Sequence, residues 1–378
     1  MTNHPQVSSD PVPLPLLSGS DIAGSVSNFG TVLPLFFAVS LTSGMSLSLM
    51  LLLCGCWYIL TGIIYRIPLS VEPLKAVAAI SIAGNLSPEL IAASGILTGL
   101  LFVILGMAGG MNWMQERIPS PVIKGIQLGL GLLLLKSAVL DFGIFDPFFF
   151  VICIGVIILF AMIRLRRDVP DLSALAILAI GVGVILHTHG MPLCRLPTLP
   201  IVTIPGLSYF MIAGPDLVLP QIPLTIANSI LATSLLASEL YHHPVSPDRL
   251  SITVGAMSLS TSILGGFPLC HGAGGVAAHY RFGARHGSSL VLGGLILIGA
   301  ATLLTDPIIL SSIPKGVFGA LLLAVAIELI NRGRKSDNLL LSGAMAIIAV
   351  PAGMAVAFIA GILFCLLLLI PGRRREKC

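Results

Sequence analysis

Residues 265–287 read GGFPLCHGAGGVAAHYRFGARHG and lie between two long apolar segments. The stretch combines a proline, a cluster of glycines and three histidines. A helix that simply crosses a membrane has no use for His-Gly-Ala-Gly-Gly at this depth, whereas a helix that begins inside the membrane does. Its first backbone N–H groups have no intrahelical acceptor, and glycine lets a ligand approach them closely. Together with the positive end of the helix dipole, this pattern predicts an anion site.

The composition is that of an integral membrane protein. The chain has 378 residues, of which 56% are hydrophobic and 10% charged, and its mean hydropathy is +1.03. Such a chain is expected to be an all-α polytopic membrane protein without a separate soluble domain. We expect no cleaved signal peptide. The seven cysteines form neither a disulfide framework nor a zinc-binding CxxC pair, so no metal or other cofactor is expected.

Hydropathy predicts fourteen membrane segments, of which the third and tenth are half-helices that follow an extended, proline-containing stretch. The predicted segments are 29–43, 46–65, 72–84, 89–110, 120–139, 147–163, 171–188, 219–240, 249–265, 272–284, 287–304, 314–330, 338–351 and 354–370. Most of the 20 Lys and Arg residues then fall on one side. The positive-inside rule makes that side the cytoplasm, with both termini there and the protein in the plasma (inner) membrane.

The two halves of the chain show a weak internal repeat. With a shift of 200 residues, Pro68 and Leu69 meet Pro268 and Leu269, so that PLSVEP overlays PLCHGA. Seven segments per half make the repeats inverted, an arrangement typical of secondary transporters with a substrate near the membrane midplane. The predicted repeats are 1–188 and 219–378, joined by an outer linker at 189–218. The alternative is that Pro and Gly are simply frequent in membrane helices.

Glu72 and Lys75 flank Pro73 at the start of the third segment. Ionisable groups at membrane depth are costly unless they face a cavity or a partner, so both are functional candidates. Their spacing of three residues also lets them pair on one helical face. A purely structural pair that caps the helix start is the alternative.

The start of the tenth segment and the polar residues of the first and eighth complete the candidate site. His271 is expected to donate a hydrogen bond or to titrate as a coupling group. Thr31 and Asn228 are expected to line a cavity, although helix–helix hydrogen bonding would also explain them. Glu239 is either an interfacial residue or a proton-coupling group. The residues alone thus offer Thr31, Glu72, Lys75, Asn228 and the run His271, Gly272, Ala273, Gly274 and Gly275 as functional candidates.

Four blocks of the sequence resemble the molybdate transporter family, which is related to the sulfate permeases. PLCHGAGGVAAHYRFGARHG is the most specific of them; PLSVEPLKAVAA, GSVSNFGTVLP and LPQIPLTIANSIL support it. The resemblance implies the seven-plus-seven fold shared with the sulfate permeases and the uracil–proton symporter. It also implies that a core domain (segments 1–4 and 8–11) moves against a gate domain (segments 5–7 and 12–14), and that the protein forms a homodimer. The substrate is expected between the starts of the third and tenth helices, in a pocket that the resemblance carries onto Thr31, Glu72, Pro73, Lys75, Asn228, His271, Gly272, Ala273, Gly274 and Gly275.

Two positions depart from the family pattern. Glu72 stands where glutamine is usual, and Asn28 stands where aspartate is frequent. A carboxylate beside a dianion is unfavourable unless it is protonated or paired. Either the acidic group has moved from the first helix to the third and still couples a proton, or the substrate is not molybdate.

The sequence therefore favours a secondary active transporter of a tetrahedral oxyanion, molybdate before sulfate, driven by protons. Proton-coupling candidates are Glu72, His271 and Glu239. The alternative is a nucleobase or organic-anion carrier on the same fold, in which Glu72 would bind a ring N–H; an anion channel is a third hypothesis. No nucleophile–base pair, HExxH motif or phosphate loop indicates an enzyme, and nothing indicates nucleic-acid binding.

Overall fold

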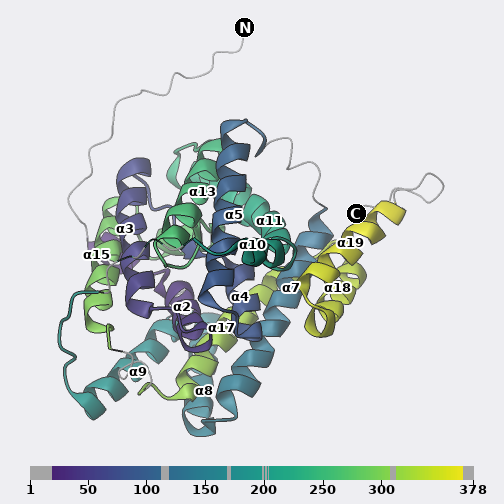
Figure 1. Ribbon diagram of the computed structural model, residues 1–378. Coiled ribbons are helices and arrows are strands. Elements are labelled where there is room, and N and C mark those ends of the chain that lie inside the picture. The colour runs from purple at the N-terminus through teal and green to yellow at the C-terminus, as the bar shows by residue number, and fades with distance from the viewer. Residues whose placement is uncertain are drawn as a thin grey trace.

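The computed structural model describes residues 19–111, 119–167, 172–197, 200, 202, 204–306 and 312–368, and they are mostly helical (Figure 1). The first half contains α1 (Gly19–Ser25), α2 (Phe29–Ser43), α3 (Leu47–Tyr65), β1 (Glu72–Pro73), α4 (Lys75–Gly84), α5 (Pro88–Met107), α7 (Ser120–Ser137), η1 (Ala138–Gly143), α8 (Pro147–Arg166) and α9 (Ser173–His189). The second half contains α10 (Leu207–Ala213), η2 (Gly214–Val218), α11 (Leu219–Leu224), η3 (Thr225–Leu231), α12 (Ala232–Tyr241), α13 (Pro247–Ile263), β2 (Leu269–Cys270), α14 (Ala273–Arg281), α15 (Ser288–Leu303), α17 (Lys315–Gly333), α18 (Leu339–Ala352) and α19 (Met354–Leu368).

Each predicted membrane segment has a helical counterpart, and the third and tenth are short helices that follow extended backbone, as predicted. The eighth segment differs because it begins at Leu207, inside the predicted linker 189–218. Its prolines interrupt the regular ladder of hydrogen bonds, and π-helical turns in η2 and η3 keep the chain helical there. The Pro-rich composition therefore predicted a linker where the structure has a helix. Both termini lie outside the described residues.

Two pairs of helices pack in the same way, and an inverted duplication would relate one pair to the other. α3 packs along α15, and α5 packs along α13 (Figure 1). These are segments 2 with 11 and 4 with 9, which the duplication exchanges with each other. Glycines bring both pairs close: Gly55 meets Gly294 in one, and Gly99 meets Gly255 in the other. Gly55 and Gly255 are separated by the same 200 residues as the sequence repeat.

Gly255→Ala is expected to destabilise the protein, because the new methyl group would overlap the carbonyl oxygen of Gly99 and the backbone of Val103. Overpacking of this kind costs about 1–3 kcal/mol. Thermal unfolding of the purified protein in detergent measures the loss. The matched control is Gly155→Ala on α8, where nothing lies within 4 Å of the added methyl group. An equal melting temperature for the two variants would contradict the close crossing.

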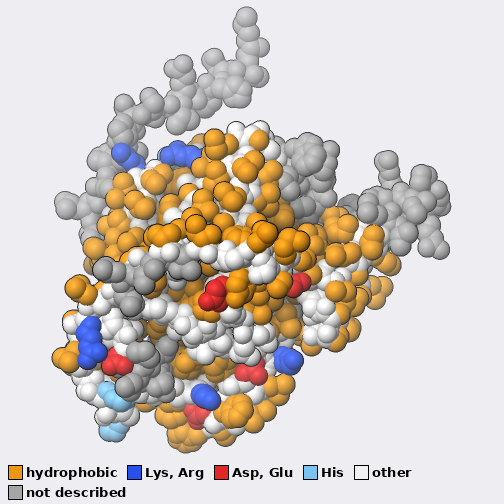
Figure 2. Space-filling model, in the orientation of Figure 1, with side chains coloured by type: hydrophobic (Ala, Val, Ile, Leu, Met, Phe, Trp, Pro, Cys, Tyr) orange, Lys and Arg blue, Asp and Glu red, His pale blue; other side chains and the backbone are white. Residues whose placement is uncertain are grey.

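The outer surface is suited to lipid. Figure 2 shows a face covered mostly by hydrophobic side chains, with few charged groups. α8 is an extreme case, because only 6% of its most apolar 18-residue stretch is buried and Phe148, Val151 and Leu159 are exposed. Among the described helices, seven are long and apolar enough to cross a membrane unaided. The chain is therefore an integral, multi-pass membrane protein.

Two extended segments meet inside the helical bundle. β1 pairs antiparallel with β2, with Glu72 opposite Cys270 and Pro73 opposite Leu269. The prolines within and before these segments prevent helix there and leave backbone groups that need partners. Each segment supplies the partners for the other, which meets the requirement for buried backbone. The pairing joins the extended segments that lead into α4 and α14, one from each repeat.

Candidate anion site

The carboxylate of Glu72 lies at the start of α14. The side chain is 1% exposed, and the Lys75 ammonium approaches its Oε2 at 2.9 Å. A methyl group added to Gly272 or Gly275 would overlap this carboxylate, so both glycines are needed for it to fit. Within the described chain, neither oxygen accepts a hydrogen bond of good geometry. Glu72 is thus a buried anion held by one cation and by the positive end of α14.

The start of α4 is occupied by a neutral oxygen. Gln221 Oε1 accepts hydrogen bonds from the backbone N–H groups of Ala76 and Val77, at 2.9 and 3.4 Å. Its Nε2 donates to Thr225 Oγ1 at 2.9 Å, which fixes the orientation of the amide. A side-chain oxygen of the protein therefore lies at the N-terminus of each half-helix, where a bound oxyanion would also place its oxygens.

A small cavity adjoins these groups. Its volume of about 20 Å³ is close to that of a single water site, so a larger ligand requires side chains to move. Its charged lining consists of Glu72, Lys75 and Arg332. The other lining residues are Gln127, Gln221, Leu224, Asn228, Ser229, Cys270 and Leu329.

A second, larger cavity of about 470 Å³ lies beside the first and is rich in cationic groups. Thr31 and Gly274 line it, and exposed Arg281 and Lys335 form part of its rim. Cationic side chains at the opening of a cavity raise the local concentration of anions. Arg332 lines both cavities. We call the larger cavity the vestibule.

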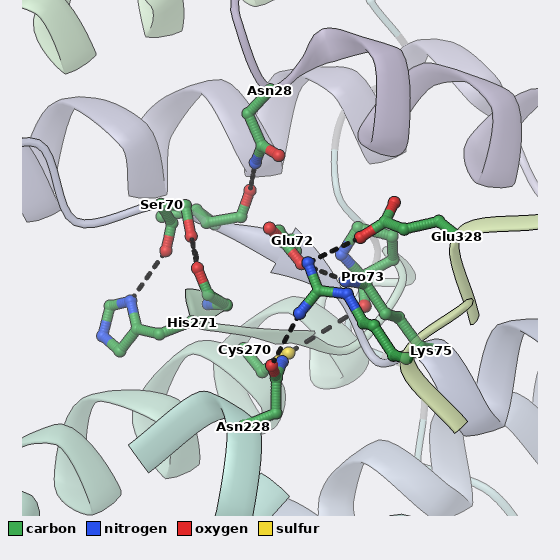
Figure 3. Close-up of polar contacts among 12 residues, drawn as sticks. Asn28, Ser70, Glu72, Pro73, Lys75, Asn228, Cys270, His271 and Glu328 are labelled. Carbon is green, nitrogen blue, oxygen red and sulfur yellow. Dashed lines mark hydrogen bonds and ion pairs between the residues drawn. The ribbon is translucent and has the colours of Figure 1, made fainter. Parts of the chain in front are cut away.

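His271 does not face either cavity. Its Nδ1 lies 2.9 Å from the carbonyl oxygen of Ser70, and its Nε2 lies 2.9 Å from Thr253 Oγ1. Figure 3 shows the ring on the side of Ser70 that is remote from Lys75 and Asn228. The Ser70 hydroxyl in turn donates to Gly272 O at 2.6 Å and accepts from Gly272 N at 3.0 Å. In this structure His271 therefore stabilises the crossing of the two extended segments.

The remaining predicted residues divide between the two cavities and the surrounding structure. Lys75 and Asn228 line the small cavity with Glu72, whereas Thr31 and Gly274 line the vestibule. The other predicted site residues, Pro73, Gly272, Ala273 and Gly275, belong to β1, to the N-cap of α14 and to its first turn. Glu239 is exposed on α12 and lines neither cavity.

Sequence reasoning did not select several residues that the structure brings to the site, including Ser70, Gln127, Glu328 and Arg332. The positive-inside rule counts Arg332 only as one of the Lys and Arg residues on the cytoplasmic side. A signal was present, because Glu328 and Arg332 have the i,i+4 spacing of a helical ion pair. That spacing is frequent on helix surfaces, and only the tertiary fold shows that this pair borders the cavity.

A family model described as "Molybdate transporter of MFS superfamily" matches residues 20–134 and 214–329, more than half of the chain. The chain belongs to this molybdate transporter family. The two matched blocks contain both half-helices and the paired extended segments, and α17 up to residue 329. Members of the family are transporters and not enzymes, and the chain is an anion transporter.

The similarity to individual family members extends over nearly the whole chain. Molybdate transporter 2 of Arabidopsis thaliana is 29% identical, covering 92% of this chain and 87% of that protein. Molybdate transporter 1 of the same plant is 28% identical, covering 95% and 90%. Molybdate transporter 1 of Chlamydomonas reinhardtii is 25% identical, covering 83% of each.

Solved structures of sulfate-permease relatives share the fold. The transmembrane domain of the cyanobacterial bicarbonate transporter BicA aligns with a TM-score of 0.64 at 16% identity, covering 92% of this chain and 96% of that one. SLC26A9 aligns with a TM-score of 0.69 at 15% identity, covering 92% and 64%. The murine protein in its inward-facing state aligns with a TM-score of 0.66 at 16% identity, covering 95% and 70%. The predicted seven-plus-seven inverted-repeat fold is confirmed by these likenesses.

Proposed function

We propose that the protein is a secondary active transporter that moves molybdate together with a proton across the plasma (inner) membrane. The observation that carries the proposal is the pairing of the two extended segments that lead into half-helices of opposite repeats, beside Lys75 and a cavity. Two positive helix ends and an ammonium group favour a bound oxyanion. The names of the relatives that cover most of the chain support molybdate as that oxyanion.

The site also suggests how binding and protonation are linked. Glu72 occupies the positive end of α14, and an oxyanion at the same place would oppose a second negative charge. A proton on Glu72 removes that repulsion and leaves the Lys75 ammonium to the substrate. Molybdate and a proton would then bind together, which is the requirement for symport.

The cavities suggest the route. The vestibule is bordered by Arg281, Arg332 and Lys335, which the positive-inside rule assigns to the cytoplasmic face. We infer an inward-facing conformation with cytoplasmic termini. Alternating access would come from movement of a core domain (segments 1–4 and 8–11) against a gate domain (segments 5–7 and 12–14), within a homodimer.

The proposal predicts that molybdate and tungstate raise the melting temperature of the purified protein. A ligand that binds only the folded state at about 100 times its Kd adds roughly 2.7 kcal/mol of stability. A thermal unfolding panel should include sulfate, uracil and xanthine, because the Glu72 carboxylate, whose oxygens accept no hydrogen bond within the described residues, could instead accept a ring N–H. Stabilisation by a nucleobase with no response to any oxyanion would select the nucleobase carrier. Proteoliposome uptake that never saturates would select a channel.

A further inference from the structure

Arg332 connects the last turn of α17 to the substrate-binding side of the bundle. Its Nη2 lies 2.8 Å from Glu328 Oε1, and its Nη1 donates to Asn228 Oδ1 at 3.5 Å. A methyl group added to Gly274 would overlap the guanidinium, which therefore lies against the first turn of α14. The side chain thus stands between the vestibule and the small cavity.

The charges around the small cavity cancel as the structure stands. Lys75 pairs with Glu72, and Arg332 pairs with Glu328. The two pairs differ in exposure: the Glu72 side chain is 1% exposed, whereas that of Glu328 is 35% exposed. Glu328 can therefore turn toward water more easily than Glu72, because an ion pair that is partly open to solvent contributes less stability than a buried one. Glu72 has no such route and can lose its charge only by taking a proton.

A dianion that enters this site needs two positive charges that are not already neutralised. Protonation of Glu72 provides one of them by releasing Lys75. Displacement of Glu328 provides the other, because the Arg332 guanidinium then has no carboxylate partner and keeps only its hydrogen bond to the neutral Asn228 amide. A guanidinium carries several N–H donors in a planar fork and can bind two oxygens of one oxyanion.

We propose that Arg332 is the second cationic ligand of the oxyanion. Its ion pair with Glu328 separates the vestibule from the small cavity and breaks when substrate oxygens replace the carboxylate. We call this ion pair the latch. This proposal rests on the proposed function, since it assigns a further residue to the same site. It makes Arg332 a determinant of specificity for dianions. The positive-inside rule by itself would explain Arg332 as a cytoplasmic charge with no role in binding the oxyanion.

Opposite effects of Arg332→Gln and Glu328→Gln on molybdate affinity test the latch. Calorimetric titration of the purified full-length protein should show Kd weakened by roughly tenfold or more in Arg332→Gln, which loses a charge-assisted contact. Glu328→Gln should bind more tightly, by roughly two- to tenfold, because substrate no longer competes with a carboxylate. Arg334→Gln, an exposed arginine two residues further on, is the matched control and should leave Kd unchanged.

Several outcomes would overturn the latch. Wild-type affinity in Arg332→Gln would remove the arginine from the site, and unchanged or weaker affinity in Glu328→Gln would remove the competition. A purely structural pair would lower the melting temperature of both variants without opposite changes in Kd. If Arg332→Gln fails to fold, the Glu328→Gln result alone decides. Failure of the wild-type protein to bind molybdate would instead count against the proposed function.

Discussion

Replacing Lys75 with methionine is expected to abolish measurable molybdate binding and to lower the free energy of unfolding by about 3–5 kcal/mol. The binding loss follows because Lys75 is the cation at the base of the small cavity, where its side chain is 11% exposed. The stability loss has a separate cause. Without its partner, the Glu72 carboxylate stays buried against Gly272 and Gly275, with only the positive end of α14 to compensate its charge.

The double variant Glu72→Gln/Lys75→Met separates these two effects. Removal of both charges avoids an unpaired buried ion, so most of the lost stability should return, while molybdate binding should not. Thermal unfolding and calorimetric titration measure the two quantities on the same samples. Lys136→Met, the same change at an exposed position of α7, is the control. Wild-type affinity in Lys75→Met would show that the lysine serves only to neutralise Glu72.

The helices and their breaks could be predicted from the sequence because they depend on local chemistry. Apolar length marks a membrane segment, and Pro or Gly at membrane depth marks a broken one. The 200-residue offset between Pro68 and Pro268 therefore led to the two half-helix starts that β1 and β2 place together. The start of the eighth segment was missed for the same reason, because its prolines indicate a linker unless tertiary packing accommodates them.

Side-chain direction could not be predicted in the same way. Successive residues of an extended segment point to opposite sides, so the face that His271 presents depends on the register with its partner. In the structure the His271 ring contacts Ser70 and Thr253, and the Glu72 carboxylate lies beside the start of α14. Contacts between elements that are far apart in the sequence could not be predicted either, because only the tertiary fold brings Arg332 to Asn228.

Glu72→Gln is expected to uncouple molybdate from protons while preserving its binding. In the proposed mechanism the wild-type protein takes up one proton with each molybdate, so binding is expected to tighten as pH falls, by about tenfold per pH unit where Glu72 titrates. The glutamine keeps the size of the side chain but carries no negative charge, so affinity should become independent of pH and at least as tight as in the wild type. Concentrative uptake driven by a pH gradient should disappear from proteoliposomes.

Proton uptake measured directly gives the decisive comparison for Glu72. Molybdate added to weakly buffered wild-type protein should raise the pH of the solution, by an amount close to one proton per site, and Glu72→Gln should give no signal. Glu89→Gln makes the same chemical change on α5, outside both cavities, and should behave as wild type. A full proton signal from Glu72→Gln would move the coupling elsewhere. Since His271 is held by Ser70 and Thr253, that result would direct attention to groups that line the vestibule, where Glu328 is the described carboxylate.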